Sequence, residues 1–331
     1  MLCTHLFNGV TEGMVGAEHP PYARGTDMAG QTAAPQTVAH MLTFDVEEYF
    51  HVEAAAAGVA PEQWESLPRR LPPVVFRLLD LLAAHRTLVT FFVLGWVARR
   101  DPNLVRRMAA AGHEIASHGM GHRMVTRLTP DEFRRDIRES RRLLEDLAGR
   151  PVVGYRAPTF SITHRTAWAL DILAEEGFQY DSSVFPIHHD RYGVPDAPRS
   201  VHRALGPGGG SLLEVPPLTA RLAGVNWPVG GGGYLRLLPV RAVAAALRAA
   251  ERTGQGGLLY LHPWELDPDQ PLLPMGRLAR WRHRVGLHRT AAKLIWLLAR
   301  FRFGPMSQWL SGIQTSAVPA FSYGNTTAAS R

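Results

Sequence analysis

Residues 113–122 read HEIASHGMGH, a short apolar run that leads directly into two histidines. The first half of this stretch predicts a buried strand, and His118 stands where that strand ends. His118 and His122 are four residues apart and each lies beside a glycine, so the pair could present two ring nitrogens to one metal ion. Histidine serves many other purposes, so the interpretation of the pair depends on the rest of the chain.

Similar apolar runs recur along the chain and alternate with helical patterns. We predict strands at 41–44, 88–93, 113–117, 152–155, 179–181, 212–215 and 258–261. We predict helices at 71–85, 103–111, 129–148, 163–176 and 238–252. This alternation predicts an α/β fold with a mainly parallel sheet, and about seven units favour a distorted (β/α) barrel of about seven parallel strands.

Chemically active side chains stand at the ends of five predicted strands. They are Asp45, His118, Arg156, Asp181 and His262. Because the carboxyl ends of parallel strands meet at one edge of a sheet, these residues are expected to share a site.

The composition allows one large core or two smaller ones, with 331 residues of which 46% are hydrophobic. The first forty residues are rich in Gly, Ala, Thr and Pro and lack an apolar period, so translation could also start at Met28 or Met41. We expect a disordered extension at 1–40, a catalytic barrel at 41–270, a basic helical extension packed on the barrel at 271–310 and a disordered tail at 311–331.

The positive charge is concentrated near the end of the chain. The net charge is +7, and no Asp or Glu follows Asp269, whereas basic residues recur from Arg277 to Arg302. A solvated helical face is the simpler interpretation, and a peripheral contact with an anionic membrane surface is the alternative. No nucleic-acid-binding motif accompanies this region, so we expect no nucleic-acid partner.

Cysteine usage and hydropathy bear on location. Cys3 is the only cysteine, so no disulfide framework is expected. We see no signal peptide and no apolar run of about 18 residues that could span a membrane. These observations favour the cytoplasm or the periphery of the inner membrane.

Two histidines and one carboxylate form a three-ligand set that leaves a position open for water. Asp45 and Glu47 lie upstream of the histidine pair, and His262 lies downstream. A divalent ion in such a set lowers the pKa of its water toward about 7. A second carboxylate can take the proton, and a histidine across the site can protonate a leaving nitrogen. The residues therefore favour hydrolysis at a metal site.

The candidate residues fall in motifs whose order is informative. The motifs are Thr43-Phe44-Asp45, Ser117-His118-x-x-x-His122, Arg156-Ala157-Pro158, Tyr180-Asp181 and Leu261-His262. In order and rough spacing they resemble the polysaccharide deacetylase family, the carbohydrate esterase group with a NodB homology domain. Stretches at 44–50, 180–186, 231–234 and 262–267 also resemble the branch associated with exosortase-linked exopolysaccharide loci. The resemblance covers about 41–303 and implies a NodB-type deacetylase barrel.

The resemblance implies a metal set made of His118, His122 and an acid. Many family members have two adjacent aspartates in the first motif, whereas here Val46 follows Asp45. The sequence favours Glu47 as the third ligand, with Glu48 as its rival. The implied metal is a divalent ion, Zn²⁺ in the first place, although other divalent transition metals would suit the same set.

The resemblance also implies catalytic roles. Asp45 would be the general base, and Arg156 would pair with it and favour its ionised form. His262 would be the general acid, with Asp181 orienting it. The backbone N–H of Thr159 would help to stabilise an oxyanion.

Substrate contacts are expected from residues near these motifs. Trp264 and Tyr234 could stack on sugar rings, and Pro158 could line the site. The sequence thus favours a metal-dependent N-deacetylase that hydrolyses acetamido groups of N-acetylhexosamine units in an exopolysaccharide and releases acetate. The alternatives are an amidohydrolase or deformylase of a smaller amide on the same fold, a catalytically inactive carbohydrate-binding homologue, and a glycosidase that uses Asp45 and Glu47 as its acid pair.

Overall fold

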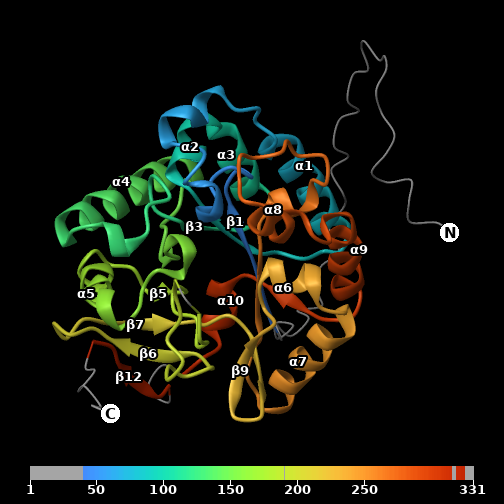
Figure 1. Cartoon of the computed structure of the whole chain (residues 1–331). Helices are drawn as coiled ribbons and strands as arrows, with labels where there is room; N and C mark the ends of the chain where they lie inside the picture. Colours follow the sequence, from blue (N-terminus) through green and yellow to red (C-terminus); the bar gives the residue numbers. More distant parts are fainter. Residues whose placement is uncertain (1–39, 190, 315–317, 325–331) are drawn as a thin grey trace, which may run out of the picture. The chain divides into compact units, whose positions relative to one another are not determined.

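The computed structural model describes residues 40–189, 191–314 and 318–324 (Figure 1). The expectation of a disordered extension therefore falls, apart from His40, on residues outside this range. His40 itself begins the first strand and is fully buried.

A mainly parallel sheet lies at the centre of the fold, as the alternation of strands and helices predicts (Figure 1). β1 (His40–Val46) pairs in parallel with β10 (Leu258–Leu261) on one side and with β2 (Thr90–Val93) on the other. The parallel series then continues through β3 (Glu114–Ser117), β4 (Gly154–Tyr155), β5 (Tyr180–Asp181) and β7 (Ser211–Glu214).

The sheet does not close into a regular barrel within the described residues. Beyond β7 it turns antiparallel, because β6 (His202–Leu205) runs against β7. Single backbone hydrogen bonds bridge the gap toward β10: Leu218 N–H donates to the Leu258 carbonyl at 3.0 Å, and Tyr260 N–H donates to the Gly230 carbonyl at 2.8 Å. The barrel is therefore distorted and open.

Helices cover the outside of the sheet (Figure 1). At the start of the longest helix, Thr129 accepts a hydrogen bond from the Glu132 N–H, and the Glu132 carboxylate accepts one from the Thr129 N–H. The helices are α1 (Leu71–Ala84), α2 (Gly95–Arg100), α3 (Pro102–Ala110), α4 (Pro130–Ala148), α5 (Trp168–Glu175), α6 (Gly232–Leu237), α7 (Val240–Arg252), α8 (Arg277–Arg284), α9 (Leu287–Leu298) and α10 (Met306–Ser311).

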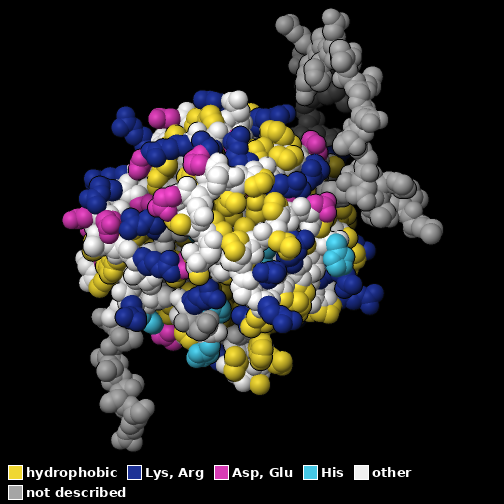
Figure 2. Space-filling model, turned by 45° about the horizontal axis from the view of Figure 1, so that its top comes forward, with side chains coloured by type: hydrophobic (Ala, Val, Ile, Leu, Met, Phe, Trp, Pro, Cys, Tyr) yellow, Lys and Arg dark blue, Asp and Glu magenta, His cyan; other side chains and the backbone are white. Residues whose placement is uncertain are grey.

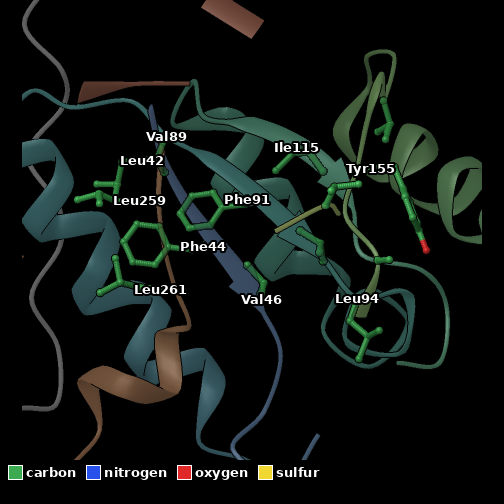
Figure 3. Packing of buried hydrophobic residues seen from close by; sticks show 14 of the residues in the cluster. Leu42, Phe44, Val46, Val89, Phe91, Leu94, Ile115, Tyr155, Leu259 and Leu261 are labelled. Carbon is green, nitrogen blue, oxygen red and sulfur yellow. The ribbon is translucent and has the colours of Figure 1, made fainter. Parts of the chain in front are cut away.

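Side chains along β1 alternate between two environments. Phe44 joins the large cluster between the sheet and the helices, where its ring lies 5.8 Å from that of Phe91 (Figure 3). Met41 belongs to a second cluster on the other side of the sheet. Thr43 and Asp45 follow Met41 at intervals of two residues, so the strand carries Asp45 to that inner side at its carboxyl end.

The end of the chain returns to the sheet. β11 (Phe303–Gly304) pairs in parallel with β1, and β12 (Ala320–Ser322) pairs in parallel with β6. Tyr323 is buried, and its hydroxyl lies 2.6 Å from Nε2 of His202. The expectation of a disordered tail at 311–331 is wrong for residues 318–324, because a buried aromatic ring and a strand pair hold this short segment.

None of the helices in the described part of the chain is long and apolar enough to span a membrane. Figure 2 shows basic and hydrophobic side chains interspersed on one face of the molecule. On α8, Leu278 and Trp281 are 60% and 55% exposed, and Arg277 and Arg280 are exposed beside them. The contact of this basic region with an anionic membrane surface stays a prediction.

Candidate metal centre and active site

Glu47, His118 and His122 converge on one point. Glu47 follows β1 and His118 follows β3, so the parallel order of β1, β2 and β3 brings both residues to the same edge of the sheet. One ligand atom from each of the three residues lies within 4.8 Å of the other two. The structure thus brings together the three residues that the sequence favours as metal ligands.

The donor atoms of this group suit a divalent cation. Oε2 of Glu47 lies 2.6 Å from Nε2 of His122 and 3.8 Å from Nε2 of His118. This oxygen is buried and accepts no hydrogen bond of ordinary geometry from the described residues. Nδ1 of His118 donates to the Arg156 carbonyl at 2.9 Å, which leaves its Nε2 lone pair for a ligand. Buried acceptor atoms that face one another without donors are costly unless a cation lies between them.

The protonation states agree with metal binding. Burial lowers the pKa of His118 to about 4, so its ring is neutral near pH 7. Burial alone would raise the pKa of Glu47, but the charge and hydrogen bond of His122 and the charge of His262 outweigh burial and hold this pKa well below its usual range. A neutral imidazole and an ionised carboxylate are the forms that bind metal.

The loop between the two histidines has unusual backbone angles. His122 has φ of 52° and Gly119 has φ of 74°, both in the left-handed region. A side chain at Gly119 would place its Cβ 2.8 Å from Oδ2 of Asp136, the oxygen that accepts the Met120 N–H at 2.8 Å. Left-handed backbone at a non-glycine residue is costly and often occurs at functional sites.

Glu48 lies away from this centre. Its carboxylate accepts hydrogen bonds from the N–H groups of Arg70 and Leu71 at 3.0 Å, at the start of α1. Burial raises its pKa to about 7, against these hydrogen bonds. Glu48 therefore caps a helix, and the geometry leaves Glu47 as the acid of the three-residue group.

Asp45 and Arg156 form a buried ion pair beside the centre. Nη1 of Arg156 donates to Oδ1 of Asp45 at 2.6 Å and to Oγ1 of Thr43 at 2.9 Å. The other guanidinium nitrogens bind Ser182, and the guanidinium carbon lies 4.0 Å from the centre of the Phe92 ring. These contacts fix the direction of the Asp45 carboxylate.

His262 lies close to both Asp45 and Glu47. Its Nε2 lies 3.9 Å from Oδ2 of Asp45 and 3.7 Å from Oε1 of Glu47. Burial alone would lower its pKa, but the Glu265 hydrogen bond and the charges of Glu47, Glu265 and Asp45 raise the pKa to about 9. His262 is therefore protonated near pH 7.

The expectation that Asp181 orients His262 is wrong. Asp181 accepts hydrogen bonds from Ser183, and its pKa is raised to about 6 by burial. Tyr180 belongs to the same cluster as Met41, on the inner side of the sheet. Asp181 is the next residue of the strand, so its side chain faces the opposite side. Glu265, which the sequence reasoning missed, takes the expected position, with Oε2 3.3 Å from Nδ1 of His262.

The residues expected to contact substrate differ in how far the structure supports that role. Trp264 is 5% exposed and stacks on His262, so it packs against the site instead of offering an open face to a sugar. Pro158 is also buried, and Thr159 beside it has φ of 59°. Tyr234 is partly buried against the inner cluster. Roles for Pro158, Thr159 and Tyr234 stay predictions.

Comparison with protein families divides the chain in two. Residues 36–180 match the polysaccharide deacetylase family, and residues 182–311 match a domain of unknown function, DUF3473. The first match contains Asp45 and the three converging residues. Residues 36–180 are therefore similar to this family. The second match contains His262 and Glu265.

Curated relatives resemble part of the chain. A chitooligosaccharide deacetylase from Bradyrhizobium sp. (strain ANU 289) is 32% identical over 141 residues, which are 41% of this chain and 62% of the relative. A peptidoglycan-N-acetylglucosamine deacetylase from Bacillus cereus is 34% identical over 96 residues, which are 29% of this chain and 35% of the relative. The chain thus spans less than two thirds of these relatives.

The fold agrees with that of a solved structure. A crystal structure of a proposed polysaccharide deacetylase from Mycobacterium smegmatis matches with a TM-score of 0.55 and 24% identity. The match covers 88% of this chain and 96% of that chain. This similarity supports the α/β fold across both halves of the protein.

Proposed function

We propose that the protein is a metal-dependent N-deacetylase of N-acetylhexosamine units in a polysaccharide. The observation that carries the proposal is the convergence of Glu47, His118 and His122, with Asp45 and His262 directly beside them. Hydrolysis of an acetamide needs a polarised carbonyl, a base for water and an acid for the departing amine. The arrangement supplies a candidate for each need.

Glu47, His118 and His122 would hold the metal ion. When bound, a divalent cation supplies Lewis acidity, which polarises the acetamide carbonyl and makes water a better nucleophile. The set of two imidazoles and one carboxylate favours Zn²⁺ among the divalent ions. The three residues come from two loops that follow β1 and β3, so the sheet preorganises them.

Asp45 would act as the general base. Its Oδ1 is bound to Arg156, and its Oδ2 faces His262 across 3.9 Å. This arrangement leaves Oδ2 as the oxygen that can accept a proton from the attacking water. Because Arg156 is fully buried and held by Ser182 as well, it keeps the carboxylate in place.

His262 would act as the general acid. Its protonated ring faces the side of the site opposite the Arg156 contact, with Nε2 toward Asp45 and Glu47. A proton donated from Nε2 to the amide nitrogen would let the sugar amine leave, and acetate would be the second product.

The substrate we propose is an exopolysaccharide that contains N-acetylhexosamine. The relatives named above act on chitooligosaccharides and on peptidoglycan N-acetylglucosamine, which share the acetamido sugar. The motifs at 44–50 and 262–267 support the exopolysaccharide branch of the family. A product amine would carry a positive charge and change the charge of the polymer.

Substitution of Asp45 tests the proposal. Asp45→Asn keeps the size of the side chain and removes its basicity, so acetate release from N-acetylglucosamine oligomers should fall by at least about 100-fold. Metal content, measured by elemental analysis, should stay at the wild-type level. Asp80→Asn serves as the control because Asp80 is exposed on α1. Full activity of Asp45→Asn would refute the proposed mechanism.

A further inference from the structure

His262 belongs to the half of the chain that matches only a domain of unknown function. We propose that Glu265 and Arg236, from the same half, are positioning residues that hold a proton on Nδ1 of His262 and direct its Nε2 at the reaction centre. This inference rests on the proposed function, because it presumes that His262 is the acid.

Glu265 contacts His262 twice. Its Oε2 accepts the backbone N–H of His262 at 3.0 Å and lies 3.3 Å from Nδ1 of the ring. The carboxylate is fully buried, and an ionised carboxylate only accepts hydrogen bonds. The ring must therefore carry a hydrogen on Nδ1, and its Nε2 then faces Asp45.

Arg236 holds the other oxygen of Glu265. Nε of Arg236 donates to Oε1 at 2.8 Å. Nη1 donates to the carbonyls of Arg282, His283 and Val285 at 3.2, 2.7 and 3.1 Å, at the C-terminal end of α8. A cation is favoured at that end by the helix dipole. Arg236 is therefore fixed from two directions and does not depend on Glu265 alone.

The glycine-rich start of α6 makes room for the carboxylate. A Cβ on Gly232 would lie only 1.7 Å from Oε2 of Glu265, so a larger residue there would displace the carboxylate. Lys293 of α9 donates to three carbonyls at the end of α6, at 2.7, 2.9 and 2.8 Å. α6 is thus anchored on both sides of Arg236.

Stacking limits the rotation of the His262 ring. Trp264 lies against His262 with ring centres 5.1 Å apart and an interplanar angle of 24°. The ring of His283 stacks on Trp264 at 4.6 Å and 22°. With one ring face covered and Nδ1 bound to Glu265, His262 keeps one orientation toward the reaction centre.

Glu265→Gln tests the positioning role. The change keeps the shape of the side chain and removes the charge that holds the proton on Nδ1. Glu251→Gln is the matched control, because Oε1 of Glu251 lies 3.0 Å from Nε2 of a buried histidine, His40, in a contact outside the site. Arg236→Lys is a second variant that keeps the positive charge.

Each protein is assayed with N-acetylglucosamine oligomers and with 4-nitrophenyl acetate. The amide needs protonation of its leaving nitrogen, whereas 4-nitrophenolate leaves as a stable anion. For Glu265→Gln we expect kcat on the amide to fall about 10- to 100-fold, with KM and the ester rate within about 3-fold of wild type. Arg236→Lys should show a smaller loss of the same kind, and Glu251→Gln should match wild type on both substrates. Equal losses on amide and ester, or no loss, would overturn the proposal.

Histidine ¹⁵N spectra test the same contact without activity. The His262 signals are identified by their absence in His262→Asn. In the wild-type protein Nδ1 should carry a slowly exchanging hydrogen, and in Glu265→Gln this signal should shift or disappear. An unchanged signal would contradict the positioning role. If the wild type releases no acetate, the proposed function fails, and the spectra still decide whether Glu265 positions the ring.

Discussion

At the scale of single residues, the proposed deacetylation depends most on the positive charge of His262. Its pKa is raised to about 9, because the Glu265 hydrogen bond and the surrounding carboxylates outweigh burial. The protonated form is therefore present below this value and is lost as the pH rises through it. A cation bound beside Glu47 would oppose part of the shift, so the loss should begin at or somewhat below pH 9.

This predicts an alkaline limb in the pH profile of kcat. With saturating substrate and metal, kcat should decline above about pH 8 to 9 with the slope of one ionisation. His262→Asn should lack this limb and retain only a small residual rate. A wild-type kcat that stays constant up to pH 10.5 would show that His262 does not act as the acid.

Motif spacing predicts some residues of the site better than others. Glu47, His118 and His122 lie together as expected, since each stands directly after a strand or in the loop behind it. Asp181 also ends a strand, but side chains alternate along the strand, and its side chain faces the side of the sheet opposite to that of Asp45. A strand-end position alone does not determine the face. The sequence did contain a pattern that could have predicted the role of Glu265, because this acid stands three residues after His262, across a Pro-containing turn.

At the scale of elements, Glu48 links the site region to the first helix. It caps α1 through the N–H groups of Arg70 and Leu71 while it is almost fully buried. Burial raises its pKa to about 7, above the ordinary value of 4.5. The folded state therefore favours the protonated carboxyl, and stability is lost as the pH rises from the unfolded pKa through the folded one.

Glu48→Gln should remove this pH dependence. Gln can still accept the helix N–H groups but never ionises, so the free energy of unfolding relative to wild type should rise by about 2 kcal/mol between pH 5 and pH 8. Urea unfolding at the two pH values measures the difference. Glu62→Gln, at an exposed position, is the control and should show no such change. A constant difference between Glu48→Gln and wild type would contradict the shifted pKa.

Long periodic elements are predictable from the sequence, and short ones are not. α4 and β10 have the expected bounds to within one residue, because a capping box marks the first and a run of apolar residues marks the second. The hairpin of β8 (Thr219–Leu222) and β9 (Val225–Pro228) was not expected. Four-residue strands that are largely exposed have no apolar pattern to reveal them, and their pairing depends on tertiary contacts.

At the scale of the whole molecule, the two family matches meet in one site. Glu47, His118 and His122, with Asp45 and Arg156, lie in 36–180, whereas His262, Glu265 and Arg236 lie in 182–311. β10 of the second half pairs directly with β1 and therefore places His262 beside the end of the first strand. Neither half contains the complete arrangement.

Equilibrium dialysis against Zn²⁺ tests the metal centre most directly. Wild type and Glu48→Gln should each bind one ion per chain, while Glu47→Gln, which makes the same change one residue earlier, should bind at least about 10-fold more weakly. Equal affinity of Glu47→Gln and wild type, or weakened binding in Glu48→Gln instead, would contradict a centre built from Glu47, His118 and His122.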